Sequence, residues 1–257
     1  MARWLMVVLT LLLGGGAWAA DEMRAEDHEL NPVSPTDLMG KDMTLTTADG
    51  AAFDVYASGP EDAKRGVVLL HEWWGLNDHI RAWADRFARL GYRAYAVDLY
   101  GGKVATDPAT AKSLMTSVDQ GQANAKITAA LQALAAPGRK LATVGWCFGG
   151  GQSLQGTLAA PELVDATVIY YGPLVADPDK LKAIRGPVLG IFANEDQSIT
   201  PEKVTAFAEA MKTAGRSLEL HRYEANHAFA NPSGQRYNSA AAKAAWQVTQ
   251  EFLDRNL

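Results

Sequence analysis

The one cysteine of the sequence, Cys147, lies between two glycines in the stretch GWCFGG. An apolar run precedes this stretch, and a helix is predicted after it from Phe148. The spacing Gly145-x-Cys147-x-Gly149 matches the sharp turn between a strand and a helix that presents a nucleophile, with cysteine in place of serine. Glycines at the flanking positions let a strained backbone approach its neighbours. The pattern predicts a thiol nucleophile, and a packing turn around a buried thiol is the alternative.

The helix predicted to begin at Phe148 would direct its free N–H groups and its positive end toward the thiol. This arrangement favours the thiolate form of Cys147 and the oxyanion of an acyl intermediate. The sequence therefore predicts acyl-transfer chemistry at this turn.

An acid and a histidine follow Cys147 in the order that this kind of turn requires, each just after a predicted strand. Asp196 follows the apolar run 188–192, and His227 follows the predicted strand 218–223. We predict Asp196 as the orienting acid and His227 as the base. Glu195 is the main competitor for the acid, and a surface loop carboxylate is the alternative for either.

The other histidines lack this placement. His28 lies in an N-terminal arm, His79 at a helix start and His221 within a strand, so each is predicted to be solvated or packed. His71 opens the stretch HEWWG, but Gly75 stands where a zinc-protease helix needs its second histidine. We therefore expect no metal ion. The position of this stretch instead fits a loop that supplies an oxyanion N–H.

The elements that must position these groups alternate between strands and helices. Residues 43–47 and 52–57 alternate apolar and polar side chains around Asp49-Gly50, which predicts an antiparallel hairpin. Further strands are expected at 66–70, 92–97, 141–144, 166–170, 188–192 and 218–223, and helices at 78–90, 107–136, 200–213 and 239–253. The order predicts an α/β fold with a mostly parallel central sheet flanked by helices.

Composition and charge exclude several classes of protein. The chain has 257 residues, 48% of them hydrophobic, and a formal charge of -5. The hydrophobic content predicts a folded protein, and the negative charge argues against the basic surface that a nucleic-acid partner requires. A single cysteine excludes an intramolecular disulfide, a thiolate zinc site and a Cys-x-x-Cys redox pair.

The first residues are typical of an export signal. Arg3 precedes an apolar run at 4–13, which is too short to cross a bilayer, and Ala17-Trp18-Ala19 is a suitable cleavage site. We predict a signal peptide at 1–19, a polar arm at 20–40 and a single domain at 41–257. The mature protein would be periplasmic or secreted, without a stable membrane span. A free thiol is unusual in such a compartment, which favours a chemical role for Cys147.

Five stretches together resemble the dienelactone hydrolase family of α/β-hydrolases, whose nucleophile is a cysteine. They are HEWWGLND at 71–78, VDLYGG at 97–102, GWCFGG at 145–150, ANEDQSITPE at 193–202 and YEANHAFANP at 223–232. The resemblance implies an α/β-hydrolase fold with an N-terminal antiparallel hairpin. It also implies that Cys147 is the nucleophile, His227 its base and Asp196 the orienting acid.

The resemblance implies further roles around the thiol. Glu72 corresponds to a glutamate that contacts the resting thiol and is displaced when substrate enters, with a carboxylate on the approach to a helix as the alternative. The backbone N–H groups of Trp73 and Phe148 would form the oxyanion hole. Pocket positions are Trp74, Tyr100, Lys103, Trp146, Tyr171 and Phe229. For the aromatic residues Trp73, Trp74, Trp146 and Phe148, core packing is the alternative to contact with substrate.

Two departures from the family bear on the substrate. Family members that open a carboxylated lactone hold its carboxylate with two arginines, and here these positions are Gly102 and Asn231. The bidentate partners of a carboxylate are therefore missing, although Lys103 could replace one charge. We expect poor use of anionic acyl groups.

Together these patterns predict a cofactor-free carboxylic ester hydrolase of the carboxymethylenebutenolidase type. It would cleave a small-molecule ester or lactone through a thioester acyl-enzyme. A thioesterase or acyltransferase using the same residues, and a non-catalytic ligand-binding domain on the same scaffold, are the alternatives. The natural substrate, the resting ionisation of Cys147, the oligomeric state and the role of the arm stay open.

Overall fold

Eight strands form one sheet in the computed structural model, which describes residues 37–257. The strands are β1 (Lys41–Thr46), β2 (Ala52–Ser58), β3 (Arg65–Leu70), β4 (Tyr92–Val97), β5 (Lys140–Trp146), β6 (Ala166–Tyr170), β7 (Val188–Ala193) and β8 (Leu218–Tyr223). Their order in the sheet is β1-β2-β4-β3-β5-β6-β7-β8. β1 and β2 pair antiparallel, as do β2 and β4, and the remaining pairs are parallel. The predicted sheet with its N-terminal hairpin is confirmed.

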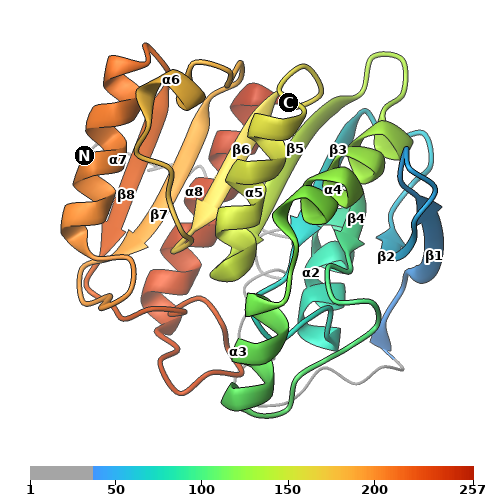
Figure 1. Ribbon diagram of the computed structural model, residues 1–257, viewed down its shortest axis with the longest axis horizontal. Coiled ribbons are helices and arrows are strands. Elements are labelled where there is room, and N and C mark those ends of the chain that lie inside the picture. The colour runs from blue at the N-terminus through green and yellow to red at the C-terminus, as the bar shows by residue number, and fades with distance from the viewer. Residues whose placement is uncertain (1–36) are drawn as a thin grey trace, which may run out of the picture.

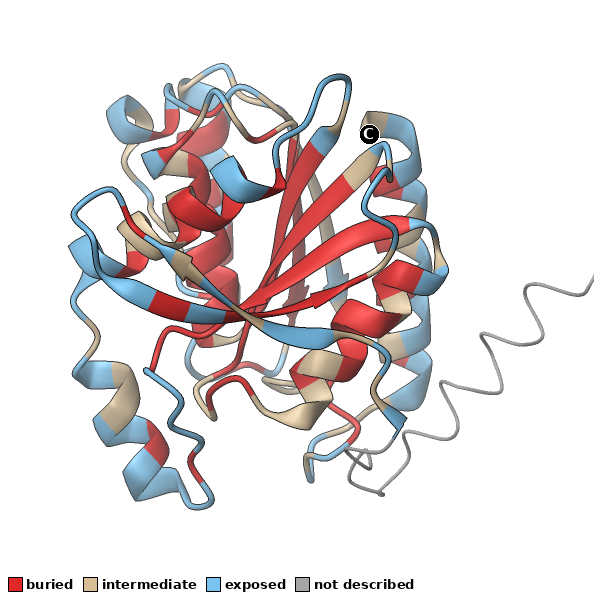
Figure 2. Ribbon diagram, turned by 90° about the vertical axis from the view of Figure 1, so that its right-hand side faces the viewer, coloured by how far each residue is buried: buried red, intermediate tan, exposed pale blue. Residues whose placement is uncertain are grey.

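Helices cover both faces of this sheet (Figure 1). They are α2 (Asp78–Arg89), α3 (Pro108–Thr116), α4 (Gln120–Leu134), α5 (Phe148–Ala159), α6 (Pro178–Leu181), α7 (Pro201–Thr213) and α8 (Ser239–Asn256). Apolar residues of α2 and α8 pack on one face, and those of α4, α5 and α7 pack on the other. Figure 2 shows the buried strands between these two layers. The chain therefore has the three-layer α/β/α arrangement of an α/β-hydrolase.

Strand β3 shows why its sequence is a continuous apolar run. Successive side chains of a strand point to opposite faces of the sheet. Val67 and Leu69 accordingly pack in the cluster with α2, whereas Val68 and Leu70 pack in the cluster with α4. A strand that is covered on both faces needs apolar side chains at every position.

The prediction of one helix over residues 107–136 is wrong, because the chain forms α3 and α4 with a break between them. The Ser117 hydroxyl donates to the Leu114 carbonyl oxygen at 2.8 Å, and the Asp119 carboxylate accepts from the Gln122 N–H at 2.8 Å. Asp119 is thus an N-cap that begins a second helix. The short helix α6, capped by Asp177, was not predicted.

The predicted signal peptide at 1–19 lies outside the described residues, as does most of the predicted arm at 20–40. Both stay predictions, which N-terminal sequencing of the exported protein would test. Within residues 37–257, no helix combines the length and apolar character needed to cross a membrane.

Candidate active site

Cys147 lies at a strained turn between β5 and α5. Its φ of 54° and ψ of -121° place it in a region that residues with a side chain rarely adopt. A Cβ atom on Gly145 would collide with the carbonyl of Gly149, and one on Gly149 would collide with the carbonyl of Leu70. Both glycines are therefore required by close backbone contacts, as the spacing indicated. Cys147 is partly exposed.

The structure brings the side chains of Cys147, His227 and Asp196 into one hydrogen-bonded chain. His227 Nε2 lies 3.1 Å from Cys147 Sγ, and His227 Nδ1 lies 2.6 Å from Asp196 Oδ2. The three residues follow β5, β8 and β7, whose carboxyl ends meet at the same edge of the sheet. This edge is where open α/β sheets bind ligands.

The hydrogen bonds among Cys147, His227 and Asp196 favour a protonated imidazole and an ionised carboxyl. Burial opposes protonation of His227, but its hydrogen bonds to Asp196 and Cys147 outweigh burial and raise its pKa to about 10. Burial likewise opposes ionisation of Asp196, but hydrogen bonds from His227 and the Ile199 backbone lower its pKa. The geometry therefore suits an ionised Asp196 beside an imidazole that readily takes up a proton.

Asp196, and not Glu195, is the acid that meets the histidine. Asp196 is 1% exposed and also accepts hydrogen bonds from the backbone N–H groups of Ser198 and Ile199. The side chain of Glu195 is exposed and lies 3.3 Å from the Asn226 amide. The two neighbouring acids are thus separated by the turn after β7, which directs only Asp196 inward.

Glu72 is a buried carboxyl that pairs with an amide. Its side-chain hydrogen bond within residues 37–257 comes from the Asn231 amide, whose oxygen accepts from the Ser233 N–H at 2.9 Å. Burial raises the pKa of Glu72 to about 7, although Asn231, His227 and Arg236 act in the opposite direction. The thiol of Cys147 meanwhile lies against His227. The contact between Glu72 and the thiol stays a prediction.

The raised pKa of Glu72 has a measurable effect on stability. A carboxyl whose pKa rises from 4.5 to about 7 on folding makes the folded state less stable as pH increases through that interval. Glutamine has the same shape, can accept from Asn231 and does not ionise. We expect Glu72→Gln to match the wild-type protein at pH 5 and to exceed its free energy of unfolding by about 2 to 3 kcal/mol at pH 8.

Urea unfolding of both proteins at the two pH values measures this difference. Other titrating groups are common to both proteins, so they cancel in the comparison. Glu219→Gln is a matched control, because this partly exposed glutamate lies on β8 and pairs with Arg255. Equal stability of Glu72→Gln and the wild-type protein at both pH values would contradict the raised pKa.

The two backbone N–H groups predicted for the oxyanion hole have no backbone acceptor within the described residues. Phe148 begins α5, and the first N–H groups of a helix have no partner inside it. Trp73 lies in the loop after β3, and no residue of the described chain accepts a hydrogen bond from its N–H. Their use as an oxyanion hole stays a prediction that this arrangement supports.

Two of the six predicted pocket residues pack directly on the groups described above. The ring of Tyr171 lies 5.3 Å from the His227 ring, edge to face. The ring of Tyr100 lies 4.6 Å from that of His71 and 5.7 Å from that of Phe148. Both tyrosines are buried, and burial raises the pKa of each hydroxyl.

The other four pocket residues differ in burial. Trp146 is 2% exposed and stacks on Trp83 at 5.0 Å between ring centroids, and Phe229 is fully buried against Tyr171. Trp74 is half-buried and Lys103 is exposed. Trp146 and Phe229 therefore belong to the core, and contact of any of the four with substrate stays a prediction.

The structure explains why glycine and asparagine stand at the two positions where the family has arginines. Gly102 has a φ of 81°, a conformation that disfavours a larger side chain, and its N–H donates to Asp98. The side chain of Asn231 is buried and occupied by Glu72 and Ser233. The described structure thus has no guanidinium at either position.

The sequence reasoning did not foresee the partners of Asn231 or the contacts of His71. His71 is fully buried and bonds through both ring nitrogens. Its only sequence signal was its place directly after an apolar strand. His221 lies 3.0 Å from Glu219, and His28 lies outside the described residues.

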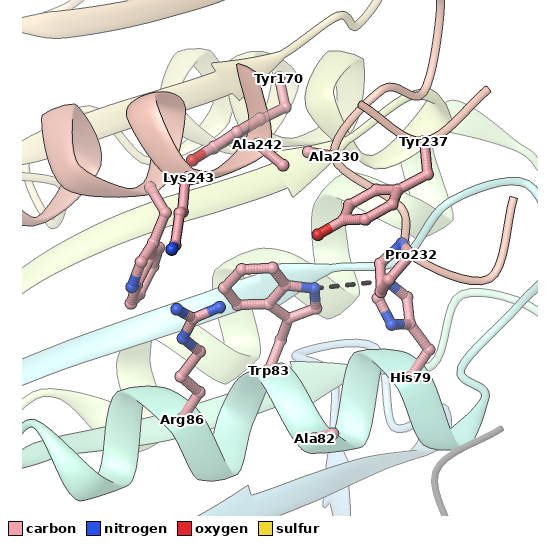
Figure 3. Close-up of a pocket in the computed structure, with 11 residues that line it drawn as sticks. His79, Ala82, Trp83, Arg86, Tyr170, Ala230, Pro232, Tyr237, Ala242 and Lys243 are labelled. Atoms are coloured by element: carbon pink, nitrogen blue, oxygen red, sulfur yellow. Dashed lines mark hydrogen bonds between the residues drawn. The ribbon is translucent and has the colours of Figure 1, made fainter. Parts of the chain in front are cut away.

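A separate cleft lies on the face covered by α2 and α8 (Figure 3). His79 and Trp83 of α2 line it, with the Trp83 indole N–H 3.3 Å from His79 Nε2. Pro232 and Tyr237 from the loop after His227 lie on its other side. Cys147 does not line this cleft, so the cleft is distinct from the hydrogen-bonded chain.

Comparisons with known proteins identify the family of this sequence. The sequence profile described as "Dienelactone hydrolase family" matches residues 53–257. A protein of Saccharolobus solfataricus, named as a candidate carboxymethylenebutenolidase, is 30% identical, with 81% of this chain and 96% of the relative covered.

Two solved structures share the fold. A candidate dienelactone hydrolase of Klebsiella pneumoniae has a TM-score of 0.74 at 26% identity, covering 84% of this chain and 99% of that one. A dienelactone hydrolase-like promiscuous phosphotriesterase from metagenomic libraries has a TM-score of 0.73 at 26% identity, covering 84% and 98%.

Proposed function

Since this chain belongs to the dienelactone hydrolase family, we propose that it hydrolyses an ester or a lactone through a triad of Cys147, His227 and Asp196. The main support for this proposal is a pair of contacts. Cys147 Sγ lies 3.1 Å from His227 Nε2, and His227 Nδ1 lies 2.6 Å from Asp196 Oδ2. Nucleophile, base and orienting acid are within hydrogen-bond reach of one another, as covalent catalysis requires.

In the acylation step, Cys147 Sγ attacks the carbonyl carbon and its proton passes to His227 Nε2. Asp196 accepts the hydrogen bond from Nδ1–H and stabilises the imidazolium that forms. The carbonyl oxygen takes the negative charge, and the N–H groups of Trp73 and Phe148 would hold it. When the oxyanion collapses, His227 gives its proton to the leaving alcohol, and a thioester on Cys147 remains.

In the deacylation step, a water molecule attacks the thioester while His227 removes its proton. A second oxyanion forms at the same position and collapses, which releases the carboxylic acid. The proton on His227 returns to Cys147 Sγ. Glu72 is proposed to move from the vicinity of the thiol when substrate enters, as in the family, and its amide partner Asn231 would then hold it.

The proposed substrate is neutral at its acyl end. Gly102 leaves no side chain at one arginine position, and Asn231 is occupied by Glu72 at the other. A carboxylate in the acyl group would have no bidentate cation there and would lie near an ionisable carboxyl.

A matched pair of esters tests this function and its specificity. We expect p-nitrophenyl butyrate to be hydrolysed with a kcat/KM about tenfold or more above that of the p-nitrophenyl monoester of succinic acid, which has the same chain length. Lactones with and without a carboxylate provide a second pair. Preference for the anionic member of both pairs would contradict the interpretation of Gly102 and Asn231, and no turnover of any ester would contradict the function.

A further inference from the structure

His71 is a fully buried histidine that the proposed mechanism does not use. Its Nε2 lies 3.2 Å from the backbone N of Leu99, and its Nδ1 lies 2.6 Å from the carbonyl oxygen of Glu72. A backbone N–H can only donate, so Nε2 accepts. Nδ1 therefore carries the hydrogen and donates it to the Glu72 carbonyl. The two contacts select one neutral tautomer of the ring.

The surroundings of the ring keep this tautomer in place. Burial lowers the pKa of His71 to about 4, so the ring is neutral at neutral pH. Tyr100 packs edge to face on the ring at 4.6 Å, and Phe148 lies at 5.9 Å. Asp98 and Lys126 are the charged groups that act on it, in opposite directions.

The Glu72 carbonyl belongs to the same peptide group as the Trp73 N–H. A peptide group is planar and trans, so its C=O and N–H point in opposite directions. The carbonyl accepts from His71 and, at 3.3 Å, from the Gly75 N–H. Holding this carbonyl in place therefore fixes the direction of the Trp73 N–H. No backbone carbonyl of the described chain accepts a hydrogen bond from that N–H.

We propose that His71 is a positioning residue that holds the Glu72–Trp73 peptide so that the Trp73 N–H can stabilise the oxyanion formed at Cys147. This inference rests on the proposed function. His71 does not touch substrate. It acts by donating a hydrogen bond to the Glu72 carbonyl, on the side of the peptide group opposite to the Trp73 N–H. Its ring also packs against Phe148, whose N–H is the second donor of the proposed oxyanion hole.

Substitution of His71 separates oxyanion stabilisation from thiol reactivity. In His71→Leu the carbonyl loses its nearer donor, and we expect kcat for p-nitrophenyl butyrate to fall about 100-fold with little change in KM, as when one oxyanion donor is lost. His71→Gln can donate to the Glu72 carbonyl and accept from Leu99, so we expect it to retain most of the activity. His221→Leu, at a half-buried position of β8 that contacts Glu219, is the control and should match the wild-type protein.

Alkylation of Cys147 by iodoacetamide supplies the deciding comparison. This displacement uses the thiolate but forms no oxyanion. We expect His71→Leu to be alkylated within about twofold of the wild-type rate, whereas ester turnover falls. Equal losses in alkylation and turnover would show a merely damaged triad and would overturn the proposal, as would full turnover by His71→Leu.

Nitrogen-15 NMR of the wild-type imidazoles covers the case in which His71→Leu does not fold. The proposal requires the Nδ1–H tautomer of His71 to persist from pH 5 to pH 9, and a titrating ring or the Nε2–H tautomer would overturn it. Failure of the proposed function is distinguishable, because the wild-type protein would then hydrolyse no ester while the His71 tautomer remained as described.

Discussion

Replacing Cys147 by alanine is expected to lower kcat/KM for p-nitrophenyl butyrate by on the order of 10⁴-fold to 10⁶-fold. The variant keeps the fold, because the side chain is partly exposed and only a sulfur atom is removed. It loses the atom that forms the thioester, so water must attack the ester directly. Steady-state hydrolysis, with a correction for the uncatalysed rate, measures the loss.

Cys147→Ser is the matched control for this variant. Serine keeps an atom at the position of Sγ, but its hydroxyl is a much poorer nucleophile without a base tuned to it. We expect turnover between that of Cys147→Ala and the wild-type protein, with unfolding midpoints within a few degrees for all three. Wild-type turnover by Cys147→Ala would refute the covalent mechanism.

Replacing His227 by glutamine is expected to have an effect of similar size, on the order of 10⁴-fold in kcat/KM. Glutamine can still donate a hydrogen bond toward Asp196, but it cannot take up the thiol proton. The raised pKa of the wild-type imidazole, about 10, favours transfer of the thiol proton to the ring. We therefore expect slower alkylation by iodoacetamide at pH 7 as well as slower turnover.

This double loss distinguishes His227 from His71. His227 acts on the thiol itself, so both reactions should slow, whereas His71 acts on the oxyanion only. Asp196→Asn is the companion variant, with an expected loss in turnover of up to about 10⁴-fold because the imidazolium loses its charged partner. Normal alkylation and turnover by His227→Gln would remove His227 from the mechanism.

That Cys147, Asp196 and His227 lie together could be predicted from the sequence, because each follows a strand whose carboxyl end lies at the same edge of the sheet. A side chain at Gly145 or at Gly149 would collide with neighbouring backbone, so the two glycines mark the turn around Cys147 in the sequence itself. The parallel sheet could also be predicted from the sequence. Strands that are buried on both faces need apolar residues throughout, and such runs alternate with helices here.

The contacts of Asn231 and His71 could not be predicted in this way. Asn231 meets Glu72 across 159 positions of sequence, and His71 meets Leu99 across 28. Such pairings depend on how loops fold over the carboxyl ends of the strands, and no periodicity encodes them. The break between α3 and α4 differs, because Ser117 and Asp119 are local signals that were available in the sequence.

The central claim is that hydrolysis proceeds through an acyl group on Cys147, and rapid-quench mass spectrometry tests it directly. The protein is mixed with p-nitrophenyl butyrate, quenched in acid within milliseconds and digested. The account predicts a burst of p-nitrophenol and a butyryl mass increase on the peptide that contains Cys147, both absent from Cys147→Ala. Efficient turnover without any adduct on that peptide, and with unchanged activity in Cys147→Ala, would contradict it.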